Sequence, residues 1–81
     1  MDAYDFLILE VITSHKKTEK LNIRLSELER IFWERIKENS ALNVGMARLG
    51  ERITKLYLSG YIENKNGYQV TKKGRKEILG V

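Results

Sequence analysis

The clearest pattern along the chain is a helical repeat of apolar and cationic residues that ends at Gly60. At about 100° per residue, three apolar residues gather on one side of this helix: Leu49, Ile53 and Leu56. Three cations form one row that we place on the opposite side: Arg48, Arg52 and Lys55. Such a helix packs on a core with its apolar side and presents cations to phosphate with the other. Gly60 occupies the position where a left-handed residue is expected to end the helix.

A short β-hairpin is expected next, formed by residues 61–64 and 68–71. With a two-residue turn between these strands, Ile62 and Val70 would lie on opposite faces of the hairpin. A three-residue loop that ends in a left-handed Gly67 pairs Ile62 with Val70 and keeps both on one buried face. We therefore favour the three-residue loop.

Polar residues with capping chemistry indicate where helices begin. Asp2 is expected to cap a first helix over residues 3–14. Ser26 and Glu29 form a capping box, which predicts the start of a second helix that runs to about Glu38.

Two further caps complete the predicted order of elements. Asn43 is expected to cap the third helix after a turn over residues 39–43, which gives the order helix, turn, helix. Thr71 is expected to cap a final basic turn or helix over residues 72–79.

The first helix carries more apolar residues than one stripe can hold. Phe6 and Leu9 fall outside the arc that contains Tyr4 and Ile8. A second copy of the chain would cover such a surface, which predicts a homodimer. In the alternative, the C-terminal segment of the same chain covers it. Trp33 lies beside the apolar stripe of the second helix, so the predicted dimer interface is Tyr4, Phe6, Leu9 and Trp33.

Charge is distributed unevenly along the chain, which we expect to form a single domain over residues 1–81. The net charge is +4. Residues 1–42 hold seven Lys or Arg against eight Asp or Glu, a net of −1, whereas residues 43–81 hold eight against three, a net of +5. Cations concentrated in one half favour a nucleic-acid partner over an evenly solvated surface.

Composition and motifs argue against several other classes of protein. The chain has no cysteine, hence no disulfide and no cysteine-based zinc site. No apolar stretch approaches the ~18 residues that span a membrane, and no signal peptide is recognised, so we expect a cytoplasmic location. His15, the only histidine, lies among polar residues without a catalytic, phosphate-loop or metal-ligand motif. We therefore expect no enzyme, no metal or other cofactor and no small-molecule ligand.

The C-terminal half resembles that of small winged helix-turn-helix regulators. The matching residues are Ile53-x-x-Leu56-x-x-x-Gly60-Tyr61-Ile62, then Tyr68-x-Val70-Thr71-x-x-Gly74. Archaeal and archaeal-virus members and bacterial MarR- and PadR-like domains show a similar order and spacing. The resemblance implies an α+β fold with a three-helix core, a small antiparallel wing sheet of three strands and a short C-terminal helix. It also implies a homodimeric transcription regulator that binds double-stranded DNA.

By this resemblance the third helix enters the major groove, and the wing tip contacts an adjacent groove or phosphates. The implied DNA-binding residues are Asn43, Arg48, Glu51, Arg52, Lys55, Lys65, Asn66, Lys72 and Lys73. An arginine reads guanine through its bidentate fork, and a lysine more often contacts phosphate. Glu51 is expected mainly to restrain its cationic neighbours. For Lys72 and Lys73, solvated charge is an equal alternative.

Two other functions stay open. A winged-helix module that binds a protein within a larger complex would show no salt-sensitive affinity for DNA. The same basic face also suits double-stranded or structured RNA.

Overall fold

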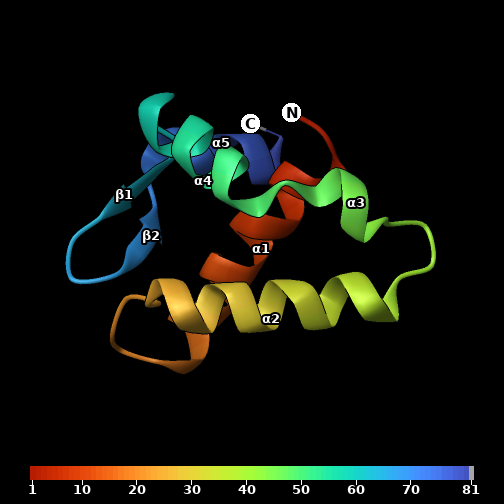
Figure 1. Ribbon diagram of the computed structural model, residues 1–81. Coiled ribbons are helices and arrows are strands. Elements are labelled where there is room, and N and C mark those ends of the chain that lie inside the picture. Colours follow the sequence, from red (N-terminus) through yellow and green to blue (C-terminus); the bar gives the residue numbers. More distant parts are fainter. Residues whose placement is uncertain (81) are drawn as a thin grey trace.

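The computed structural model describes residues 1–80 and places one helix, α1 (Ala3–Thr18), at the centre of the molecule (Figure 1). Four elements pack against it: α2 (Leu25–Glu38), α4 (Leu49–Leu58), β2 (Tyr68–Val70) and α5 (Lys72–Leu79). The remaining elements are α3 (Val44–Ala47) and β1 (Ile62–Asn64). The predicted α+β class is thus confirmed.

The central position of α1 explains its excess of apolar residues. Ile8, Leu9, Val11 and Ile12 are each at most 1% exposed, because other elements cover α1 on several sides. The prediction that Leu9 lies in a dimer interface is therefore wrong, since the same chain buries this residue completely. The helix also continues to Thr18, four residues beyond the predicted end. The basic residues of its last turn suit the negative end of the helix dipole.

The caps at the starts of α1 and α2 differ from each other. Asp2 caps α1 as predicted, in a reciprocal box with Asp5: the Asp5 amide donates to the Asp2 carboxylate at 3.1 Å, and the Asp2 amide donates to the Asp5 carboxylate at 3.3 Å. The predicted capping box of Ser26 is wrong, because α2 begins at Leu25, two residues before the predicted start, with Arg24 as N-cap and no side-chain bond. A β-bridge at the preceding Ile23 holds the chain extended there and sets this earlier start.

A break divides the predicted third helix into α3 and α4. Asn43 caps α3 as expected, and its side chain accepts from the Gly45 amide at 2.7 Å. Arg48 then adopts a left-handed conformation (φ 44°, ψ 53°) between the two helices. Residues two apart in a continuous helix point in nearly opposite directions. The break at Arg48 allows both Ala47 and Leu49 to face the core, where they are buried.

The hairpin has the predicted register, with Ile62 opposite Val70. Both side chains are buried on the same face, and Gly67 has a positive φ of 118°. A third strand is reduced to one bridge, in which Ile23 and Tyr68 exchange backbone hydrogen bonds of 3.3 and 2.6 Å. The sheet that the family resemblance implies is therefore present as two strands and a single bridged residue.

Gly60 and Thr71 place the hairpin relative to the helices on either side of it. Gly60 has a φ of 81°, and its amide donates to the Tyr57 carbonyl at 3.1 Å while the Tyr61 amide donates to the Leu56 carbonyl at 3.0 Å. These two bonds form a Schellman motif and confirm the predicted end of the helix. Thr71 caps α5 as predicted and also donates to the Gly60 carbonyl at 2.6 Å.

Gly74 marks the closest approach between α5 and the hairpin. A Cβ atom at this position would lie 2.2 Å from the Tyr61 carbonyl oxygen and 2.6 Å from a methyl group of Val70. Backbone cannot yield as a flexible side chain can, so only glycine fits without moving one element. The last glycine of the sequence motif therefore has a packing role.

Gly74→Ala should destabilise the protein by about 1–3 kcal/mol, the usual cost of overpacking. Gly50→Ala is the matched control, because nothing lies within 4 Å of a Cβ there and alanine favours a helix over glycine. Urea unfolding of both variants checks this expectation. A Gly74→Ala protein as stable as the parent would show that α5 does not pack tightly on the hairpin.

Candidate nucleic-acid interface

The outward face of α4 differs from the face predicted from sequence. Leu49, Ile53 and Leu56 are buried, as expected. At about 100° per residue, the side chains opposite this stripe are those of Glu51 and Leu58, and the predicted cationic row lies to one side of it. The outward face carries four exposed residues: Glu51, Thr54, Lys55 and Leu58. It is therefore a mixed polar and apolar surface with one lysine.

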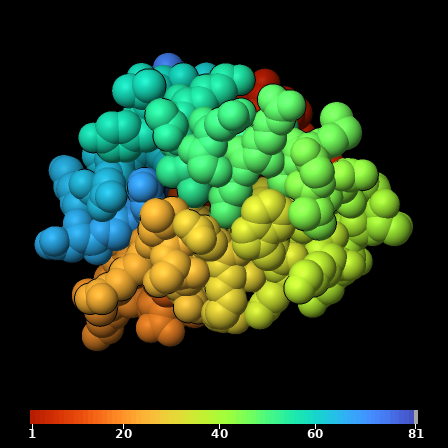
Figure 2. Space-filling model, in the orientation of Figure 1, coloured from red at the N-terminus to blue at the C-terminus, as the bar shows by residue number. Residues whose placement is uncertain are grey.

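A groove of about 360 Å³ runs between α4 and the hairpin. Thr54, Tyr57 and Leu58 line it from α4, whereas Asn64 and Tyr68 line it from the strands. Figure 2 shows the face on which α4 lies beside α2, with the hairpin at the edge of both. Side chains that can hydrogen-bond, stack or contact a methyl group meet in this groove, and they are the kinds that read base edges.

Arg52 does not belong to the exposed surface, and its predicted role in DNA binding is wrong on geometric grounds. Its side chain is only 17% exposed and forms ion pairs with Asp2 at 2.7 Å and with the buried Asp5 at 3.2 Å. The same guanidinium donates to the carbonyls of Met46 and Ala47 and lies 4.8 Å from the ring centre of Tyr4. On the helical wheel Arg52 lies only about 65° from the middle of the apolar stripe, so it turns toward α1.

This cluster shifts the protonation equilibrium of Asp2. Burial opposes the ionised form, but hydrogen bonds from the Asp5 amide and from Arg52, together with the charge of Arg52, outweigh it. The pKa of Asp2 is therefore lowered from its ordinary value of 3.8. Burial likewise opposes the charge of Arg52, yet the two aspartates raise the pKa of its guanidinium.

Arg48 and Glu51 lie at the N-terminal end of α4. The left-handed backbone projects Arg48 into solvent, where its side chain is 70% exposed and 3.9 Å from the Glu51 carboxylate. An exposed pair at this distance contributes little to stability, so Arg48 can exchange Glu51 for another anion. Of the three cations that Glu51 is expected to restrain, it therefore contacts only Arg48, and only loosely.

The tip of the hairpin is held in place while its polar groups stay exposed. The Asn22 side chain donates to the Lys65 carbonyl at 2.9 Å, and a Cβ at Gly67 would lie 2.8 Å from the Asn22 carbonyl oxygen. Asn66 is left-handed, with a φ of 54°. The Lys65 amine is 3.9 Å from the Glu63 carboxylate in an exposed pair. Lys65 and Asn66 therefore project from a fixed support, as a wing tip would.

Lys72, Lys73 and Asn43 have different surroundings from one another. Lys72 is exposed and has no ion pair within residues 1–80. The Lys73 amine donates to the Ser59 carbonyl at 2.6 Å and lies 4.5 Å from the ring centre of Tyr61, so it fastens α5 to the end of α4. Asn43 caps α3, and its amide donates to the Tyr4 hydroxyl at 2.8 Å. The side chain of Lys73 and both the side chain and the amide of Asn43 are thus already used in hydrogen bonds within the fold.

Only one of the four residues predicted for a dimer interface remains an exposed apolar side chain. Phe6 is 38% exposed. Tyr4 is half-buried and bonded to Asn43, whereas Trp33 packs edge-on against Phe32 with ring centres 5.2 Å apart. Leu9 is buried, as described above.

Sequence reasoning missed Arg24 and the groove residues of α4. Arg24 is exposed and lines a depression that includes Asn64 and Asn66 of the hairpin. The chain around Arg24 is extended and gives no helical pattern, so only the bridge at Ile23 brings this cation to the hairpin. The third wing strand that the family resemblance implies is the one signal that could have indicated this proximity.

No family model, curated protein or solved structure matches this chain. Within residues 1–80, no helix has the length and apolar character needed to cross a membrane. The same part of the chain does not bring together three His, Cys, Asp or Glu side chains able to hold a metal ion.

Arg52→Ala should cost about 3 kcal/mol of unfolding free energy, because it leaves the carboxylate of Asp5 buried without a counter-charge. Lys55→Ala, one turn further along the same helix, removes an exposed cation and should stay within about 0.5 kcal/mol of the parent. Chemical denaturation of the two variants gives the comparison. Equal stability of both would mean that the Arg52 cluster contributes nothing to folding.

Acid should weaken the protein partly through Asp2. A carboxylate whose pKa is lowered by folding stabilises the folded state above its unfolded pKa and loses that contribution as the pH falls through the folded pKa. The free energy of unfolding should therefore decline between about pH 5 and pH 2, and less steeply in Asp2→Asn. Glu77→Gln, an exposed substitution with the same change of charge, should keep the parent slope. Identical slopes for the parent and Asp2→Asn would contradict this assignment.

Proposed function

We propose that the protein is a winged helix-turn-helix regulator of transcription that binds double-stranded DNA with α4 and the hairpin. In this proposal α2, α3 and α4 form the helix-turn-helix and β1 and β2 form the wing. The order of elements and the predicted hairpin register support it.

The observation that carries the proposal is the arrangement of exposed cations around one face. Arg48 lies at the start of α4, Lys55 lies on its outward side, and Lys65 lies at the tip of the hairpin beyond the groove. None of the three is tied into the core. Cations placed at both ends of an uncharged groove can grip the backbone while the groove faces the bases.

The roles follow from the side chains. Lys55 and Lys65 contact phosphates, and Asn66 adds a hydrogen bond at the wing tip. Arg48 reads a guanine when it leaves Glu51. In the groove, Leu58 contacts a thymine methyl group.

Assembly as a homodimer is part of the proposal, now supported only by exposed apolar residues near the chain ends. These are Phe6 on α1 and Leu79 on α5. A dimer would bind two half-sites one helical turn or a multiple of it apart. The number of chains bound per DNA site decides this part of the proposal.

A protein-binding module is the second candidate, and one observation favours it. Apolar side chains of α3 and α4 are exposed to solvent, among them those of Val44, Met46 and Leu58, the last 78% exposed. A partner protein would cover these residues, whereas phosphates would not. Loss of partner binding in Leu58→Ser with no affinity for DNA in the parent would select this candidate.

Lys55→Ala and Lys65→Ala should each weaken binding to all duplexes by a similar factor. Each should also reduce the slope of log affinity against log salt by about one. Lys37→Ala is the matched control, because this exposed lysine lies at the end of α2 in the half of the chain with net negative charge. Its affinity and slope should equal those of the parent. Titration of a fluorescent duplex with each of the three variants, at several salt concentrations, measures both the affinity and the slope.

Two results would contradict the proposal. An equal loss in Lys37→Ala would mean that binding depends on net charge alone and not on this face. Structured RNA that displaces the duplex at lower concentration than unlabelled DNA would assign the same face to RNA.

A further inference from the structure

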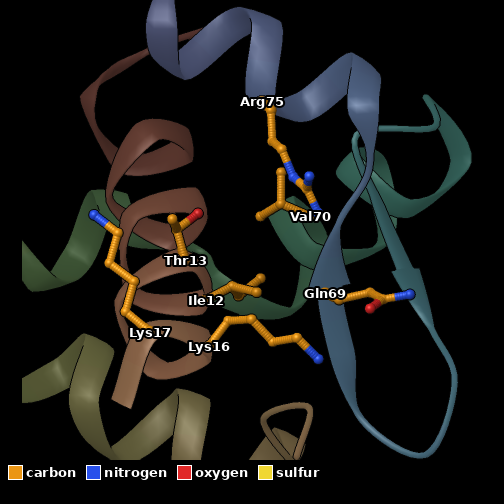
Figure 3. A pocket seen from close by; sticks show the side chains of 7 residues that line it. All are labelled: Ile12, Thr13, Lys16, Lys17, Gln69, Val70 and Arg75. Atoms are coloured by element: carbon orange, nitrogen blue, oxygen red, sulfur yellow. The ribbon is translucent and has the colours of Figure 1, made fainter. Parts of the chain in front are cut away.

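A second candidate site lies away from α4, in a cavity between α1, β2 and α5. Its volume is about 160 Å³. Figure 3 shows the side chains that line it: Ile12, Thr13, Lys16, Lys17, Gln69, Val70 and Arg75. None of these residues belongs to the groove between α4 and the hairpin.

The cavity has an apolar floor and a cationic wall. Ile12 and Val70 are buried beneath it. Arg75 extends from α5 toward Val70, and Lys16 extends from α1 toward β2, whereas the amine of Lys17 points away (Figure 3). No carboxylate is among the lining residues, and Arg75 has no ion pair within residues 1–80. An uncompensated arginine over an apolar floor favours an anion.

Thr13 supplies an independent indication of a ligand. Its hydroxyl is the one buried side-chain polar atom of residues 1–80 without a hydrogen-bond partner. Buried polar groups in folded proteins are nearly always paired, so an unpaired one at a cavity wall calls for an explanation. A bound oxygen acceptor would pair it, after a small shift of the side chains that now cover it.

The size of the cavity limits what can bind. A volume of 160 Å³ is that of about five waters and is well below the roughly 300 Å³ of common ligand pockets. A nucleotide or coenzyme does not fit in such a space, but a tetrahedral oxyanion does. Lys16 bonds the Asn22 side chain at 2.9 Å and still has donors left, since an ammonium has three.

We propose that this cavity binds inorganic phosphate or the terminal phosphate of a small phosphorylated metabolite. Arg75 supplies the paired donors, Lys16 supplies a second positive charge, and the Thr13 hydroxyl donates to a third oxygen. The proposal does not depend on whether the protein binds DNA.

The test is a titration of the protein with inorganic phosphate, monitored by NMR spectroscopy. The ionic strength is kept constant with chloride. Signals of Thr13 and of the Arg75 side chain should shift and saturate. Arg75→Gln should lower the affinity by at least about tenfold, because it removes both charge-assisted hydrogen bonds of the guanidinium. Thr13→Val should also lower it, whereas Thr13→Ser, which keeps the hydroxyl, should bind as the parent does.

Lys76→Gln is the matched control, because it makes the same change of charge on the same helix at a residue that does not line the cavity. Its affinity should stay within about twofold of the parent, because Lys76 does not contact the cavity and salt screens its charge at longer range. An equal loss in Lys76→Gln and Arg75→Gln would overturn the proposal and indicate diffuse attraction of anions. NMR shifts that do not saturate with phosphate, or that chloride alone produces, would also overturn the proposal.

A duplex titration distinguishes a small phosphate ligand from a phosphate of the DNA backbone. If Arg75→Gln weakens binding to DNA as strongly as binding to phosphate, the cavity holds a backbone phosphate and the small-ligand proposal fails. Unchanged affinity for DNA together with reduced affinity for phosphate supports it.

Discussion

The arrangement of α3 and α4 depends on Arg52, whose guanidinium donates hydrogen bonds to the carbonyls left unpaired at the break between these helices. The left-handed residue Arg48 ends α3, so the last carbonyls of α3 lack the amide partners that a continuing helix would supply. Arg52 donates to two of these carbonyls, and its remaining donors reach Asp2 and Asp5 at the start of α1. A planar guanidinium with five donors can make all these contacts at once, which a lysine cannot. The interaction therefore ties α1, α3 and α4 together.

The outward face of α4 is a consequence of this contact. Because Arg52 turns inward, the exposed side of the helix keeps Lys55 as its one cation, beside Thr54 and Leu58. Positive charge for a nucleic-acid partner must then come from the ends of the surface, at Arg48 and at the tip of the hairpin. Such a division suits a site in which the rim grips phosphates and the centre contacts bases.

The features that sequence predicted correctly are those that local chemistry decides. Asp2 and Thr71 cap helices because their side chains reach amides only a few residues ahead, and Gly60 ends a helix because a left-handed backbone favours glycine. The errors arise where distant segments decide the outcome. Leu9 is buried because helices and a strand from the rest of the chain surround α1, and Arg52 is removed from the surface by carboxylates about 50 residues away in sequence.

The hairpin lies between the groove and the cavity and is held by contacts at its base and at its tip. Gly74 packs against the backbone at its base, and Asn22 bonds its tip. Coupling between two sites by conformational change needs an element with two arrangements, and a movement of the hairpin would have to break both contacts. An anion beside Arg75 would instead act through charge, because neutralising a cation lowers the positive field that attracts nucleic acid. Such an effect would decline with added salt, whereas a conformational switch would not.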